Sequence, residues 1–254
     1  MNILIRRGTS MTISRMFYIF GLVTILTFAA IFIDGIFGLG ISNDAAFETF
    51  IAPFVMLVSF VLAFPYLRKR FASWFILDKS KIHQAICLPI LAAIALGFVI
   101  NIYRYIPYWL GSDPIGVGSN QVTKIEDITQ VGLTLLTSII GPLNEELMFR
   151  FLIYVGLFYL FTKNKNRFPW LDKLNANIFT FKNPLYILGL VCCINVLFAL
   201  VHGPNLLNFP LYFLGGAVNT LFFIRYGFLS AWISHGVFNF FSGITLSIVV
   251  QTMV

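Results

Sequence analysis

The chain has 254 residues, of which 59% are hydrophobic and 11% charged, with a formal net charge of +7. Soluble domains carry about 25% charged residues, so this composition excludes an ordinary soluble protein and favours one embedded in the lipid bilayer. The positive residues gather in short segments between apolar runs, which indicates a role in membrane orientation and no nucleic-acid partner. The three cysteines lie in apolar segments and are odd in number, which argues against a disulfide framework.

Three uncharged runs in the first half of the chain are long enough to cross a bilayer, which takes about 20 residues. The first is too long for a signal-peptide core, and no small-residue cleavage site follows it, so we expect it to be retained. The three runs cover residues 16–33, 49–67 and about 85–103.

The second half continues with an apolar segment, residues 128–162, that contains Gly141-Pro142. Proline lacks an N–H and disrupts helix interiors, so we expect this fourth span to break or kink there. Three more apolar runs follow at residues 183–201, 209–224 and 227–250. We therefore predict an all-α fold, a polytopic membrane helix bundle of about seven transmembrane helices without an internal repeat.

In this arrangement of spans, positive charge is concentrated in every second loop. Of the 17 Lys and Arg residues, only Arg104, Lys124 and Arg150 lie outside the N-terminal segment, the loops 68–83 and 163–182, and the turn at Arg225. Cytoplasmic connections are enriched in Lys and Arg. We therefore expect a cytoplasmic N-terminus and an outside C-terminus, in what we take to be a bacterial plasma membrane.

The stretch GPLNEELMFRF, Gly141–Phe151, places charged side chains within apolar sequence. Ionised groups are rare in membrane segments and usually functional. Glu146 and Arg150 are spaced i, i+4, with the acid first, which suits an ion pair on one helix. Glu145 lacks such a partner in its own helix and is the freer carboxylate. The alternative is that both carboxylates only tie helices together.

Two histidines also lie in the apolar runs. His202 ends one run, with Phe198 one helical turn before it; His235 and Asn239 are spaced i, i+4 and share a helix face. Both side chains of the second pair can donate hydrogen bonds to a developing oxyanion. The alternative for His202 is a polar cap at a helix end.

Three motifs occur in order: EELMFR reads as EExxxR, FALVH as FxxxH and HGVFN as HxxxN. This order is similar to that of the CPBP family of intramembrane proteases, which includes the CAAX prenyl endopeptidases. The resemblance covers about residues 141–243. We therefore divide the chain into an N-terminal three-span region, residues 1–127, and a protease core, residues 128–254.

The resemblance implies that Glu145 activates water with His202 beside it, and that His235 and Asn239 stabilise the oxyanion. It implies supporting positions for the remaining motif residues, namely Glu146, Arg150 and Phe198. Phe151 departs from relatives that often have glycine after the arginine. The implied activity is hydrolysis of a peptide bond in a substrate within the membrane: a membrane-associated or prenylated protein, or a peptide precursor.

The same side chains support other functions. Glu145, His202 and His235 are zinc ligands by type, but Asn239 is a poor ligand and HExxH is absent, so we favour a metal-free glutamate mechanism, with zinc as the alternative. A proton- or ion-coupled transporter also uses intramembrane carboxylates, although it predicts repeat symmetry. A non-catalytic immunity or scaffold protein is the third alternative.

Ideal helix geometry places these residues at different depths. At about 1.5 Å per residue, His235 lies about 15 Å from Arg225, whereas Glu145 and His202 lie about 27–30 Å from the basic loop 163–182. They meet only if helices tilt or project beyond the bilayer. We expect the site in the cytoplasmic half, because CAAX proteases work there.

Overall fold

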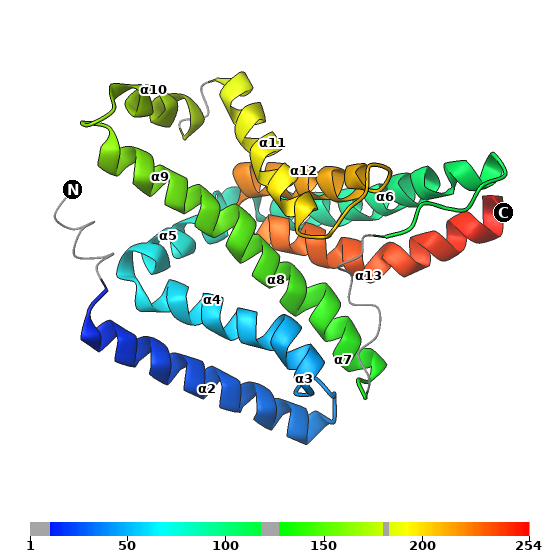
Figure 1. Ribbon diagram of the computed structural model, residues 1–254, viewed down its shortest axis with the longest axis horizontal. Helices are drawn as coiled ribbons and strands as arrows, with labels where there is room; N and C mark the ends of the chain where they lie inside the picture. The colour runs from blue at the N-terminus through cyan, green and yellow to red at the C-terminus, as the bar shows by residue number, and fades with distance from the viewer. Residues whose placement is uncertain (1–10, 118–126, 180–182, 254) are drawn as a thin grey trace.

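The computed structural model describes residues 11–117, 127–179 and 183–253 (Figure 1). These residues are helical with no strand, which confirms the all-α prediction. Three of the elements, η1, η3 and η4, are wider π-helical turns, and η2 is a 3-10 turn. The elements are α2 (Ile13–Phe37), α3 (Asp44–Ala46), η1 (Phe47–Ile51), α4 (Ala52–Ala63), α5 (Pro65–Phe75), η2 (Lys79–Lys81), α6 (Ile82–Trp109), α7 (Gln130–Leu135), η3 (Leu136–Ile140), α8 (Gly141–Glu145), η4 (Glu146–Leu152), α9 (Ile153–Asn164), α10 (Pro169–Ile178), α11 (Pro184–Leu200), α12 (Phe209–Tyr226) and α13 (Phe228–Met253).

Within the described residues, four helices are long and apolar enough to cross a membrane. They are Ile13–Phe37, Asp44–Ala63, Lys79–Trp109 and Phe228–Thr252. The expected number of seven is therefore not confirmed. One reason is length, because α11 is apolar but has only 17 residues. A second is charge, because the segment from α7 to α9 carries the two glutamates and Arg150.

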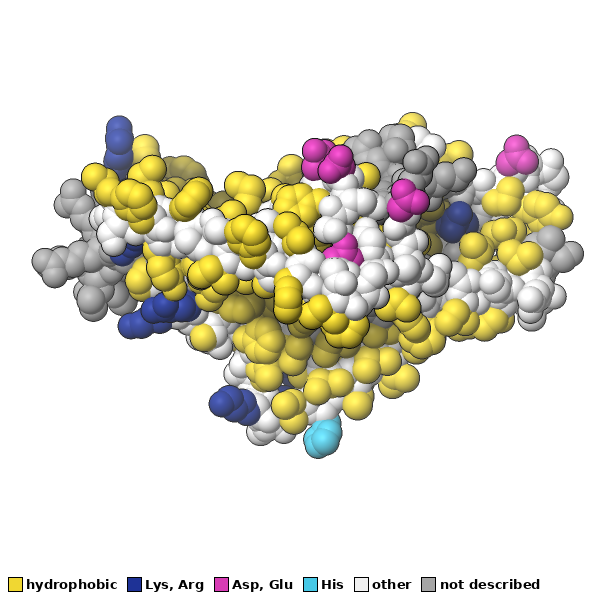
Figure 2. Space-filling view, turned by 90° about the horizontal axis from the view of Figure 1, so that it is seen from below, with side chains coloured by type: hydrophobic (Ala, Val, Ile, Leu, Met, Phe, Trp, Pro, Cys, Tyr) yellow, Lys and Arg dark blue, Asp and Glu magenta, His cyan; other side chains and the backbone are white. Residues whose placement is uncertain are grey.

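The surface agrees with an integral membrane protein. Most of the coloured side chains in Figure 2 are hydrophobic, with most of the visible Lys and Arg toward the left and the Asp and Glu in the centre and toward the right. Phe17, Phe20, Phe28 and Phe32 of α2 are each at least 67% exposed. An apolar surface of this kind is stable against lipid chains but not against water.

The helix does not break at Gly141-Pro142, so this form of the prediction is wrong, while a kink there stays a prediction. The chain stays helical from α7 to α9 (Figure 1), with π turns on both sides of α8. The Gly141 N–H donates to the Leu136 carbonyl, five residues back, and Pro142 has no N–H. The carbonyl of Thr137 therefore has neither its α-helical nor its π-helical donor. Asn239 of α13 supplies one instead, with its amide nitrogen 2.8 Å from that oxygen, so the proline is accommodated without a break.

Helix α13 packs closely against backbone carbonyl groups of η3. Trp232 donates its indole N–H to the Ile139 carbonyl at 3.0 Å. One turn later, Gly236 lies so near the Ser138 carbonyl that any Cβ would collide with it. The π turn and α13 are therefore fitted to each other, and this contact carries His235 toward the glutamates.

The helices run back and forth through the molecule (Figure 1). Direction reverses from α2 to α4, from α4 to α6, from α6 to the α7–α9 segment, and from α12 to α13, while α11 crosses obliquely. Helix α6 packs along α13 more extensively than any other pair, and α4 packs on α8. The N-terminal region therefore forms part of the same bundle as the protease core.

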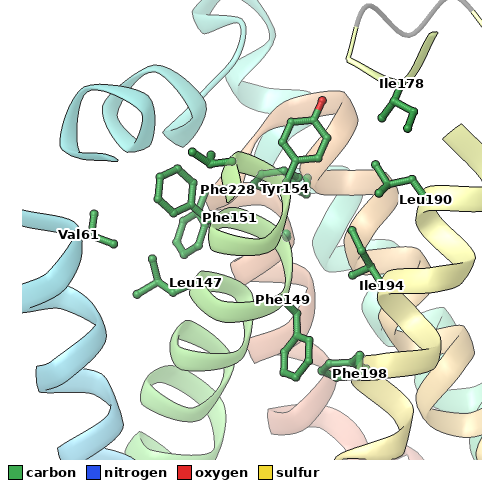
Figure 3. Close-up of a cluster of buried hydrophobic side chains, with 13 residues drawn as sticks. Val61, Leu147, Phe149, Phe151, Tyr154, Ile178, Leu190, Ile194, Phe198 and Phe228 are labelled. Atoms are coloured by element: carbon green, nitrogen blue, oxygen red, sulfur yellow. The ribbon is translucent and has the colours of Figure 1, made fainter. Parts of the chain in front are cut away.

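The main hydrophobic core surrounds η4 and the start of α9 (Figure 3). Phe151 is fully buried, with its ring edge-on to Phe71 at 5.2 Å between ring centres. Figure 3 shows it beside Phe228 and Leu147, while Phe149 points the other way, toward Phe198. The large side chain at position 151 thus fills space between helices, and Phe149 connects the core to the site.

Candidate active site

A pocket of about 590 Å³ opens between α4, α6, α8, α11, α12 and α13. All three sequence motifs contribute to its wall. The motif residues among those lining it are Glu145, Phe198, His202, His235 and Asn239. Segments far apart in the chain therefore meet at one cavity.

Glu145 lies between the two histidines. Its Oε2 is 3.6 Å from Nε2 of His235 and 3.8 Å from Nε2 of His202. Both distances exceed that of a normal hydrogen bond. The Oε2 atom is buried, yet it receives no hydrogen bond from the described residues. A free acceptor thus faces both imidazole rings.

The partners of the other ring nitrogens indicate which tautomers the histidines adopt. His202 Nδ1 lies 2.8 Å from the Phe198 carbonyl, and His235 Nδ1 lies 2.8 Å from Oε1 of Glu146. A carbonyl or a carboxylate only accepts, so Nδ1 carries the hydrogen in both rings. In a neutral ring Nε2 is then an acceptor. If both rings are neutral, the two Nε2 atoms and Glu145 Oε2 are three acceptors that face one another.

The two adjacent glutamates occupy different environments. The Glu145 side chain is 34% exposed, whereas Glu146 and Arg150 are both fully buried and form an ion pair at 3.2 Å. The pairing expected from the i, i+4 spacing is therefore present, although the turn is π-helical. Glu146 also receives the His235 hydrogen bond, so Arg150, Glu146 and His235 form one chain of polar contacts.

Arg150 has further partners on α11 and α12. It donates to Asn195 Oδ1 at 3.3 Å, to the Gly216 carbonyl at 3.1 Å and to Thr220 Oγ1 at 3.4 Å. The Phe198 ring lies 4.2 Å from the guanidinium carbon, within range of a cation–π interaction. A Cβ at Gly216 would meet these same side chains, so only glycine fits.

The sequence reasoning did not single out Asn195, Thr220 or Tyr212, which belong to this site. Asn195 carried a usable signal, because it is a polar residue in an apolar run, on the same helix face as Phe198 and His202. Thr220 gave a weaker signal of the same kind. Tyr212, whose ring stacks on His202 at 4.5 Å between centres, gave none.

Asn239 reaches the pocket, but one of its two amide hydrogens is used by Thr137. The other remains for a ligand. Its expected role as an oxyanion donor therefore stays a prediction.

The depth mismatch expected from ideal helices is resolved by the packing. Figure 1 shows the α12–α13 turn set inward from the left-hand ends of α2 and α9. That turn rests on the end of α5, where the Leu77 N–H donates to the Tyr226 carbonyl at 3.1 Å. This displacement brings His235 level with Glu145 and His202.

The pocket lies toward the helix ends opposite to the basic loops. Its wall contains the start of α4, the end of α6, the end of α11 and the start of α12. A cytoplasmic N-terminus would therefore put the pocket in the outer half of the membrane. The expected orientation and the expected cytoplasmic site do not fit together.

The described residues contain no group of three or more His, Cys, Asp or Glu side chains arranged to hold a metal ion. Glu145, His202 and His235 have suitable donor atoms for zinc, so zinc stays the alternative to a metal-free mechanism.

Residues 127–241 match the family model described as type II CAAX prenyl endopeptidase Rce1-like. No curated protein and no solved structure matches the chain. The matched range contains all three motifs and the partners of Glu145 and Arg150 described above. Residues 127–241 therefore form a domain of the Rce1-like CAAX prenyl endopeptidase family.

Proposed function

We propose that the protein is an intramembrane endopeptidase in which Glu145 activates a water molecule for peptide hydrolysis. The observation that supports this most strongly is the meeting of Glu145 Oε2 with two imidazole Nε2 atoms, at 3.6 and 3.8 Å, in the wall of a pocket. When His235 is protonated on both ring nitrogens, the acceptors that remain, Glu145 Oε2 and His202 Nε2, need hydrogen-bond donors between them. A water molecule supplies two O–H donors there and keeps a lone pair for attack.

In the proposed reaction, Glu145 takes one proton from this water as its oxygen attacks the peptide carbonyl. The new C–O bond turns the carbonyl oxygen into an oxyanion. When the amine leaves, the C–N bond breaks and Glu145 returns the proton to the nitrogen. His202 holds the water, and its own ring is fixed by the Phe198 carbonyl.

The oxyanion needs donors, which we assign to His235 Nε2 and the second amide hydrogen of Asn239. For this donation His235 must carry a proton on both ring nitrogens. The Glu146 carboxylate, 2.8 Å from Nδ1, balances the resulting charge, and Arg150 keeps that carboxylate in place. The buried Arg150 is therefore a positioning residue that acts through Glu146.

We propose as substrates membrane-associated proteins, prenylated proteins or peptide precursors, in line with the family description. The pocket wall combines apolar side chains with polar groups from six helices, which suits a peptide segment more than an ion. The test is quantitative mass spectrometry of membrane peptides from cells with the wild type and with Glu145→Gln. A peptidase predicts cleaved peptides that depend on Glu145; a scaffold protein predicts identical sets.

We propose a metal-free mechanism. Purified protein is expected to contain well under one metal ion per chain and to keep its activity after dialysis against a strong chelator. Elemental analysis and activity before and after dialysis are the measurements. Stoichiometric zinc, with activity lost on its removal and restored on its return, would reverse this assignment.

We further propose seven membrane crossings, with α7–α9, α11 and α12 crossing in addition to the four longer spans. The reversals of direction in Figure 1 and the alternating basic loops support this topology. Reporters fused at residues 75 and 172 should then report the cytoplasm, and one at residue 254 the outside. A cytoplasmic reporter at residue 254 would mean an even number of crossings.

A further inference from the structure

Arg104 lies in the wall of the active-site pocket, although it belongs to the N-terminal region that the family match does not cover. Among the described residues that line this pocket, Arg104 is the only Lys or Arg. A charged group in a partly apolar wall costs free energy unless it is paired, so the position of Arg104 indicates a function.

The side chain is fixed in place. Nε donates to the Ile115 carbonyl at 3.0 Å, and a terminal nitrogen lies 3.4 Å from Oδ1 of Asn101. Asn101 in turn donates to the Ser242 carbonyl at 3.2 Å and to Thr245 Oγ1 at 2.9 Å on α13. Asn101 thus links the guanidinium to residues 242 and 245 of α13.

These contacts use only part of the guanidinium. It has five N–H donors, and its two hydrogen bonds go to neutral oxygens. Among the described residues, it forms no ion pair with a carboxylate. Arg150, by contrast, has Glu146 as a partner. The remaining donors of Arg104 are therefore available to a ligand in the pocket.

We propose that Arg104 binds a carboxylate of the peptide substrate and so selects which peptides enter the site. An arginine with a free pair of N–H groups matches the two oxygens of a carboxylate, and such charge-assisted contacts are the stronger hydrogen bonds. The proposal rests on the proposed peptidase function. The carboxylate is either the C-terminal group of the substrate or an acidic side chain.

The spacing along α13 places this carboxylate relative to the bond that is cut. Residues 242–245 follow His235 by seven to ten positions, or about 10–15 Å at 1.5 Å per residue. An extended peptide covers about 3.3 Å per residue. About three to five residues therefore separate the bound carboxylate from the scissile bond.

The test measures binding of short peptides to the full-length purified protein by thermophoresis. The probes are acetyl-trileucine with a free C-terminal carboxylate, the same peptide as its amide, and the amide of acetyl-Leu-Leu-Asp beside its Asn counterpart. We expect the preferred acid to bind the wild type roughly ten- to a hundredfold more tightly than its neutral counterpart. Whichever pair shows the difference identifies the source of the carboxylate.

In Arg104→Gln the ratio should fall to about one, and in Arg104→Lys it should fall part of the way, because lysine keeps the charge without the planar fork. Arg225→Gln, which removes an exposed cation at the end of α12, is the matched control and should keep the ratio. Glu145→Gln should also keep it, so a failure of the proposed chemistry does not affect this result.

Three outcomes would overturn the proposal. The first is equal binding of acids and neutral peptides by the wild type, which remains decisive even if Arg104→Gln does not fold. The second is an acid preference that persists in Arg104→Gln. The third is an equal loss of affinity for all probes in that variant, which would indicate that Arg104 holds the Ile115 loop or contacts a lipid phosphate.

Discussion

Replacing Glu145 with glutamine should reduce peptide hydrolysis about 10²- to 10⁴-fold, the usual contribution of a general base. The variant should still fold, because Glu145 is 34% exposed, forms no ion pair with Arg150 and accepts no hydrogen bond at Oε2. Glutamine keeps the shape of the side chain but cannot take a proton from water.

The measurement is the turnover of a cleaved peptide by protein purified in detergent, together with the thermal midpoint of the same sample. Asp172→Asn, on α10 and exposed, is a matched change from carboxyl to amide that should leave both unchanged. Near-full turnover by Glu145→Gln would show that Glu145 is not the base.

Replacing Arg150 with alanine should have the largest effect on stability. Removing one partner of a buried ion pair typically costs about 3–5 kcal/mol, because the other charge stays buried without compensation. Here Glu146 would be that charge, at 0% exposure, and Asn195 and Thr220 would lose a donor as well. We expect lower abundance in membranes and lower activity together.

Quantitative immunoblotting and thermal denaturation of solubilised protein would measure this loss. Arg225→Ala is the control, since its side chain is exposed. The double variant Arg150→Ala, Glu146→Ala should be less damaged than the sum of the single variants, because it no longer buries an unpaired carboxylate. An Arg150→Ala protein as abundant and stable as Arg225→Ala would contradict the structural role of the ion pair.

Sequence reasoning could identify those polar residues of the site that lie within apolar runs, because burying a polar side chain there is costly. Glu146 and Arg150 could be paired from their spacing, since i, i+4 neighbours share a helix face. Asn195 followed the same rule but was missed. The hydrogen bond from Asn239 to Thr137 could not be predicted, because it depends on a π turn that avoids the expected break at Pro142.

By itself, the sequence determined the helical class, the membrane environment and the set of polar side chains in the core, because the length of an apolar run and the cost of burying charge are local properties. Only the tertiary structure decided that Glu145 faces both histidines, that the α12–α13 turn is set inward, and that Arg104 shares their pocket. These features depend on how far helices that are distant in the sequence are shifted along their axes relative to one another. Such displacements are set by side-chain packing between helices, which no single segment of the sequence encodes.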